Sequence, residues 1–103
     1  MPTSYTFDIS SAAKLLSLLS HDGRRRVLLL VLEREWDVTS LASEIGLSQS
    51  ALSQHLTKLK AGGLVKARRK GQTIYYSCSS EKAATLTAVL QELYPLQELR
   101  AAA

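Results

Sequence analysis

The chain has 103 residues, a formal net charge of +4 and one cysteine. A chain of this length forms one domain, predicted here over residues 1–103, and one cysteine excludes an intramolecular disulfide. No basic stretch followed by an apolar run opens the sequence, so we expect a cytoplasmic protein. Two distant histidines and the lack of a catalytic triad, paired carboxylates or a phosphate-binding loop argue against an enzyme.

The first two helices are predicted from the spacing of their apolar residues. One helix begins near Asp8 or Ser10, and a second over about residues 23–35 contains an apolar run that is typical of a buried helix. We expect Trp36 to cover the end of the second helix. We expect His21, which precedes that helix, to have a structural role.

Two short helices separated by a glycine turn are predicted next. Asp37 can cap a helix over Val38–Ile45, and Ser48 can cap a second helix that ends at the glycine pair 62–63. Gly46 permits the tight turn between them. A short amphipathic helix, a glycine-containing turn and a second helix form a helix-turn-helix.

The second helix of this pair has an apolar face and a polar face. Its leucines recur at i, i+4 and i+7, which predicts the buried side. The other side carries amides, hydroxyls and lysines without a carboxylate, and these groups suit base edges and phosphates in a major groove. An ordinary solvated face is the alternative, and His55 could instead pack against the turn. The DNA-contacting residues predicted here are Ser48, Gln49, Ser50, Ser53, Gln54, His55 and Lys58.

A short basic hairpin is predicted after the glycine pair. Leu64–Arg68 and Thr73–Ser77 have strand-forming residues around a turn in which Gly71 permits the tight backbone. A tip with the sequence Arg-Arg-Lys-Gly-Gln can lie along phosphates or enter a minor groove. The predicted fold is therefore mainly α with a small β-hairpin wing, a winged helix-turn-helix. The DNA-contacting residues predicted in the wing are Arg68, Arg69, Lys70 and Gln72.

Positive charge is concentrated in this part of the chain. Between Glu44 and Glu81 there are six lysine and arginine residues and no acidic residue, so the rest of the chain carries −2 of the total charge of +4. This distribution predicts a polyanionic partner, double-stranded DNA. A winged helix that binds protein is the rival interpretation, which acidic residues in the wing would have favoured.

The residues from Leu41 to Ser77 resemble the ArsR/SmtB-type family of small bacterial winged-helix repressors, most closely its non-metal NolR/HlyU-like branch. The run from His21 to Leu28 is similar to the family's loop into its second helix, although Asp22 and Gly23 replace the more usual Pro and Thr. The resemblance implies a transcriptional regulator, expected to be a repressor, that binds an inverted-repeat operator.

The resemblance also implies a homodimer whose contact is formed by the first and last helices. Both helices carry apolar stripes that exceed the needs of a small monomer core. The alternative is that both stripes pack on the core of their own monomer. The predicted interface residues are Ala12, Leu15, Leu16, Leu19, Leu86, Val89, Leu90 and Leu93.

No metal or other cofactor is expected. The family's thiolate site needs a cysteine cluster on the third helix, where residues 37–42 contain none, and its other site needs histidine on the last helix, where Glu81–Leu99 has none. The lone Cys78 is expected to be a small packing residue. A thiol-responsive regulator acting through Cys78 is the alternative.

Overall fold

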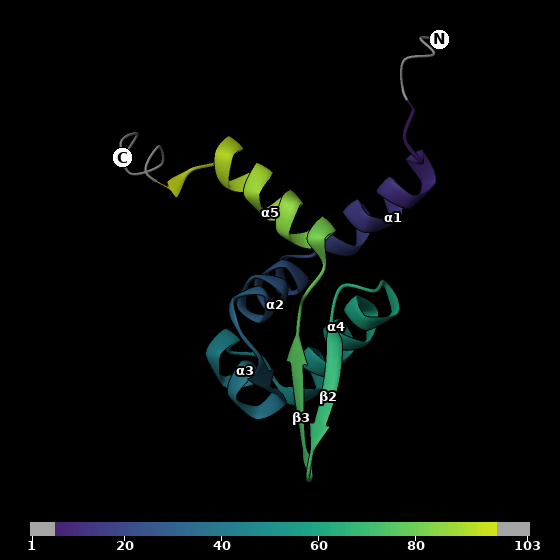
Figure 1. The fold of residues 1–103 in the computed structure, drawn as a ribbon. Helices are drawn as coiled ribbons and strands as arrows, with labels where there is room; N and C mark the ends of the chain where they lie inside the picture. Colours follow the sequence, from purple (N-terminus) through teal and green to yellow (C-terminus); the bar gives the residue numbers. More distant parts are fainter. Residues whose placement is uncertain (1–5, 97–103) are drawn as a thin grey trace.

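The computed structural model describes residues 6–96, and within them the chain forms five helices and one three-stranded antiparallel sheet (Figure 1). This architecture confirms the predicted winged helix-turn-helix. In chain order the elements are α1 (Ile9–Leu19), α2 (Asp22–Glu33), β1 (Trp36–Asp37), α3 (Val38–Ile45), α4 (Gln49–Ala61), β2 (Lys66–Lys70), β3 (Thr73–Ser77) and α5 (Glu81–Leu93).

Side-chain caps fix where the helices begin. The side chains of Asp8, Asp37, Ser48 and Ser80 each accept a hydrogen bond from the backbone N–H three residues later, at the starts of α1, α3, α4 and α5. Gly46 ends α3 with φ 80°, a left-handed conformation that glycine adopts without strain. The helix-turn-helix boundaries predicted from these residues are confirmed.

The core lies between α2 and the helix-turn-helix. Val27 and Val31 of α2 are buried with the leucine stripe of α4, Leu52, Leu56 and Leu59. In Figure 1 the helices α1 and α5 diverge above α2, while α3 and α4 lie below it and the β2–β3 wing projects from the bottom. The wing and the outer side of α4 are therefore left at the surface.

The sheet contains one strand that was not predicted, and one wing strand begins later than predicted. The strand order is β1-β3-β2, with Trp36 paired to Tyr76. The predicted strand start at Leu64 was wrong, because Leu64 and Val65 are buried in the core and the N–H of Leu64 donates to the Leu59 carbonyl at the end of α4. β2 begins only at Lys66.

The ends of α2 and α5 follow from local contacts. α2 stops at Glu33, two residues earlier than predicted, and Arg34 is extended with its guanidinium 3.5 Å from the centroid of the Trp36 ring. Trp36 covers the end of this helix as predicted, since its Nε1 donates to the Leu30 carbonyl at 3.0 Å. α5 stops at Leu93, ahead of Pro95. No helix in residues 6–96 is long and apolar enough to cross a membrane.

Candidate nucleic-acid interface

The outer side of α4 presents an open polar surface. Its residues Ser50, Ser53, Gln54, Thr57 and Lys58, called the reading face below, line a shallow hollow and are all exposed. Within residues 6–96 the Gln54 amide makes no hydrogen bond, and Lys58 has no ion pair. These two side chains are free to contact another molecule.

The two residues at the start of this helix have intramolecular partners. The Ser48 hydroxyl accepts from the N–H of Ala51 at 3.1 Å, and Nε2 of Gln49 donates to Oγ1 of Thr39 on α3 at 3.3 Å. The Ser48 hydroxyl therefore serves as the helix cap. Gln49 must release Thr39 before Nε2 can donate that hydrogen to DNA.

His55 lies on a different side of α4, against the start of α2. Its ring centroid is 4.6 Å from that of His21, and a Cβ built on Gly23 would lie 2.7 Å from its Nε2. Burial lowers the pKa of His55, and the neighbouring charges of His21, Arg24 and Lys58 lower it further. These contacts correspond to the packing alternative, so we leave His55 out of the reading face.

His21 forms the start of α2, in agreement with its predicted structural role. Its Nδ1 accepts a hydrogen bond from the N–H of Gly23 at 3.1 Å and so caps the helix. The two histidines are 34 positions apart in the sequence. Their proximity could be foreseen only from the packing of α2 on α4.

The base of the wing is fixed by an ion pair that the sequence did not reveal. Nε and Nη2 of Arg68 donate to the two carboxylate oxygens of Glu35 at 2.9 and 2.7 Å, and the Arg68 guanidinium lies 5.2 Å from the centroid of the Tyr75 ring. Hydrogen bonding to Arg68 lowers the pKa of Glu35, and the same bonds raise that of Arg68. The charge of Arg68 is thus paired within the protein.

The tip of the wing is more open than its base. Arg69 donates from Nε to the carbonyl of Gly71 at 3.1 Å, which leaves its terminal nitrogens available. Lys70 and Gln72 are exposed. Gly71 has φ 63°, which allows the tight turn between the two strands. Among the four predicted wing contacts, Arg68 alone has a carboxylate partner within residues 6–96.

The eight predicted interface residues have different environments. Leu19 is 7% exposed and belongs to the monomer core, so the monomer-packing alternative holds for this residue. Leu15 and Leu86 are half-buried against that core, and Ala12 is also half-buried. The other four remain exposed in the monomer, and they are Leu16, Val89, Leu90 and Leu93.

The residues considered for metal or thiol chemistry do not form a cluster. Within residues 6–96, no three His, Cys, Asp or Glu side chains lie close enough together to hold a metal ion. Cys78 is half-buried and packs against the core, and its N–H donates to the carbonyl of Val31 at 3.0 Å. It is the only cysteine in the chain.

A helix-turn-helix with an open polar face on its second helix, next to a basic hairpin, defines the class of winged-helix DNA-binding proteins. Residues 21–67 match the family model described as bacterial regulatory protein, arsR family. The chain belongs to this ArsR family and is a DNA-binding transcriptional regulator.

Three curated relatives agree with this assignment. The nodulation protein NolR of Rhizobium meliloti is 45% identical over 87 residues, covering 84% of this chain and 71% of the relative. The transcriptional activator HlyU of Vibrio cholerae is 39% identical over 82% of this chain and 79% of the relative. A biofilm growth-associated repressor of Xylella fastidiosa is 36% identical over 89% of this chain and 81% of the relative.

A solved structure supports the fold. The crystal structure of NolR from Sinorhizobium fredii matches with a TM-score of 0.80 and 41% sequence identity, covering 87% of this chain and 96% of that chain. The similarity therefore extends beyond the helix-turn-helix to most of the described residues.

Proposed function

We propose that this regulator acts as a homodimer on an inverted-repeat operator and places one α4 helix in each of two successive major grooves, about 10 bp apart. The observation that carries this proposal is the reading face, where Gln54 and Lys58 are exposed and unpaired. The Gln54 amide can donate to and accept from an adenine edge, while Lys58 neutralises a phosphate.

The wing supplies contacts to the flanking backbone or minor groove. Arg69, Lys70 and Gln72 at its tip approach the DNA, and Arg68 remains paired with Glu35 at its base. This division of roles revises the prediction that all four wing residues contact DNA directly. It is supported by the bidentate geometry of the Arg68–Glu35 pair.

A second copy of the chain covers the apolar surface of the terminal helices. Leu16 is 58% and Leu93 60% exposed, and a hollow between α1, α2 and α5 is lined mainly by apolar surface. Dimerisation buries this surface and lets two weak half-site contacts act together. Replacing Leu93 by Lys should shift the sedimentation coefficient towards that of a monomer. A variant that sedimented as the unmodified protein does would exclude Leu93 from the interface.

The regulatory effect proposed is repression, since a dimer bound at a promoter blocks polymerase. The names of the relatives include both a repressor and an activator, so whether this protein represses or activates transcription needs a direct test.

We propose that no metal acts as effector, because α5 carries no histidine and residues 37–42 carry no cysteine. As a regulator of bacterial transcription it would work in the cytoplasm, where the chromosome lies, and residues 1–103 would form one domain.

The decisive experiment is to recover and sequence genomic DNA that co-purifies with the protein, and then to titrate the enriched fragment by fluorescence anisotropy at increasing salt. DNA binding through phosphates predicts that log K falls linearly with log salt, at about −0.9 per contact. Enrichment of an inverted repeat is the expected result. Absence of binding at low salt would refute the proposed function, and a transcription assay on the same fragment distinguishes repression from activation.

A further inference from the structure

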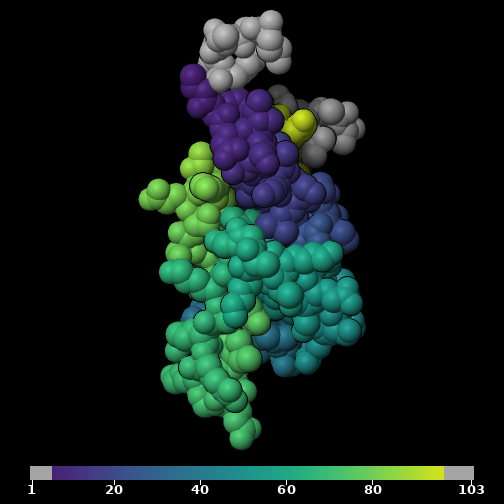
Figure 2. Space-filling model, turned by 90° about the vertical axis from the view of Figure 1, so that its right-hand side faces the viewer, coloured from purple at the N-terminus to yellow at the C-terminus, as the bar shows by residue number. Residues whose placement is uncertain are grey.

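Three cations from three different helices meet beside the reading face. Lys14 of α1, Arg24 of α2 and Lys58 of α4 line a hollow together with the hydroxyl-bearing residues Ser10 and Ser17. Lys58 also belongs to the reading face, so the two hollows share a wall. Figure 2 shows α1, in purple, directly above the teal α4 on one continuous side of the molecule.

The positive charge of this hollow is not neutralised within the described residues. No carboxylate lines it, and no ion pair in residues 6–96 includes Lys14, Arg24 or Lys58. Asp22, the acidic residue nearest to Arg24 in the sequence, is paired with Arg25 and Arg26 at 3.3 and 2.9 Å, and the Asp8 carboxylate, nearest to Lys14, accepts from the N–H and hydroxyl of Ser11. The hollow therefore presents three positive charges and hydroxyl groups to solvent, which suits a phosphate.

The polar surface of α1 is separate from its apolar surface. Ser10, Lys14 and Ser17 follow i, i+4, i+7 and form one stripe, and Lys14 is the only charged residue in this helix. Ile9 and Leu16, which are exposed apolar residues, lie more than a third of a turn around the helix from Lys14. A dimer contact through the apolar side would leave the Lys14 stripe accessible.

On the basis of the DNA binding proposed above, we infer that the hollow between α1, α2 and α4 is an additional binding site for the DNA backbone. A phosphate of the duplex held by α4 lies against Lys14, Arg24 and Lys58. The Nε of Arg24 donates to the carbonyl of Leu18 at 2.6 Å, which holds this side chain in place while its terminal nitrogens remain available. The DNA-binding surface thus extends from the wing across α4 to α1.

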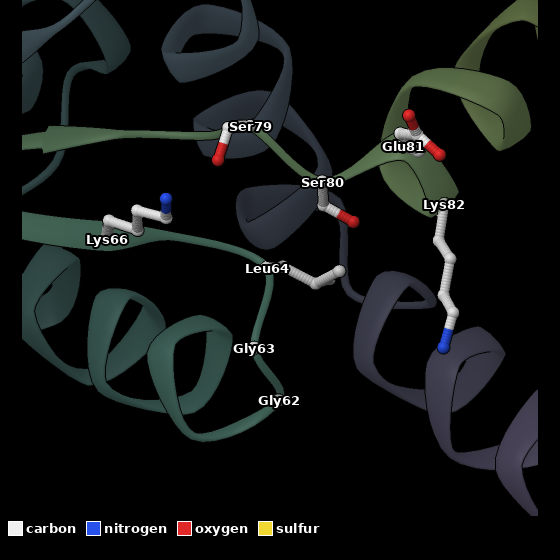
Figure 3. Close-up of a pocket in the computed structure, with 8 residues that line it drawn as sticks. All are labelled: Gly62, Gly63, Leu64, Lys66, Ser79, Ser80, Glu81 and Lys82. Atoms are coloured by element: carbon white, nitrogen blue, oxygen red, sulfur yellow. The ribbon is translucent and has the colours of Figure 1, made fainter.

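The test compares Lys14→Gln with Lys82→Gln, two changes that each remove one positive charge from an exposed side chain. Lys82 lies in the first turn of α5, beside a different hollow between α5 and the end of α4 (Figure 3). In that view Lys82 and Lys66 lie on opposite sides of Leu64, and Glu81 lies next to Lys82. Neither substitution touches the buried core, and thermal denaturation checks that both variants fold.

Affinity for a random-sequence duplex is measured over a range of KCl concentrations. Lys14→Gln removes one cation per subunit from the DNA contact and should reduce the slope of log K against log salt by up to about 1.8 per dimer, since each phosphate contact contributes about 0.9. Lys82→Gln should keep the slope of the unmodified protein. Equal slopes for Lys14→Gln and the unmodified protein would overturn the inference.

A second measurement locates the contact on the DNA. Single methylphosphonate substitutions, which remove one phosphate charge each, are scanned along the recovered operator. One position should weaken binding of the unmodified protein and of Lys82→Gln more than it weakens binding of Lys14→Gln, in which only Arg24 and Lys58 still face that phosphate. If no position discriminates between the variants, the backbone contact at Lys14 is refuted, whereas an unmodified protein that binds no duplex at all would refute the proposed function instead.

Discussion

The reading face of α4 and the base of the wing are both polar, yet their side chains are held very differently. Gln54 and Lys58 are exposed and have no hydrogen bond or ion pair within residues 6–96, while Arg68 is held by two hydrogen bonds to Glu35 and lies over Tyr75. A free side chain can bind a partner, whereas a paired one fixes the position of its own strand. Lys58 and Arg68, both basic and ten positions apart, can therefore have separate roles, one in binding a partner and the other in holding the wing.

The largest effect is expected from Gln54→Ala. Losing one bidentate base contact should weaken operator binding by about 1–3 kcal/mol at each half-site and leave random-duplex affinity unchanged. Gln49→Ala should have a smaller effect, because the Gln49 amide is already bonded to Thr39. Anisotropy titrations against operator and random duplex measure both variants. Unchanged operator affinity for Gln54→Ala would show that the reading face is assigned wrongly.

A pair of adjacent substitutions separates the tip of the wing from its base. Arg69→Gln should weaken binding to every duplex and reduce the salt slope by about 0.9 per subunit, because a phosphate contact is lost. Arg68→Gln should leave the slope close to that of the unmodified protein, since the Arg68 guanidinium is paired with Glu35. If both variants changed the slope of log K against log salt by a similar amount, the distinction between a DNA-contacting Arg69 and a paired Arg68 would be contradicted.

Glu35→Gln tests the Arg68–Glu35 ion pair by changing its acidic partner. This change removes the carboxylate and should loosen the base of the wing, which weakens DNA binding by a smaller factor than Arg69→Gln does. If Glu35 acts only through Arg68, the double variant Glu35→Gln with Arg68→Gln should bind no more weakly than Arg68→Gln alone. Additive losses in this double-mutant cycle would show that the two residues act independently.

The smallest effect is a dependence of stability on pH. The pKa of His55 is lowered in the folded protein by burial, so below the ordinary value of 6.5 the unfolded chain binds the proton first. The contribution of neutral His55 to the free energy of unfolding is therefore present above pH 6.5. It is lost as the pH falls towards the lowered pKa that His55 has in the folded protein. Urea denaturation at several pH values gives the free energy of unfolding of the unmodified protein and of His55→Gln. An identical pH dependence for the two proteins would refute a contribution from His55.

The helix-turn-helix could be predicted because its determinants are local. Asp37, Ser48 and Gly46 act within a few residues of the boundaries they set, and the leucine stripe of α4 follows directly from helical periodicity. The start of the first wing strand was predicted two residues too early, because Leu64 and Val65 are buried in the core and the N–H of Leu64 donates to the Leu59 carbonyl of α4 instead of to a strand. Burial of this kind depends on the tertiary structure.

The least predictable parts of the site depend on contacts between distant residues. Glu35 and Arg68 are 33 positions apart, and their pairing requires the β1-β3-β2 order, in which β1 has only two residues. The hollow at Lys14 likewise needs α1, α2 and α4 to meet. Periodicity identifies which side of each helix is exposed, but it does not say which exposed sides become neighbours.

The close approach of Gly23 to His55 has a consequence for how this protein can evolve. A Cβ at position 23 would lie 2.7 Å from the imidazole Nε2, so the two positions share one volume. A methyl group gained at position 23 would push the imidazole outward, unless position 55 became smaller at the same time. Substitutions at these two positions should therefore be coupled, so that Gly23 of α2 limits which side chains α4 can carry at position 55.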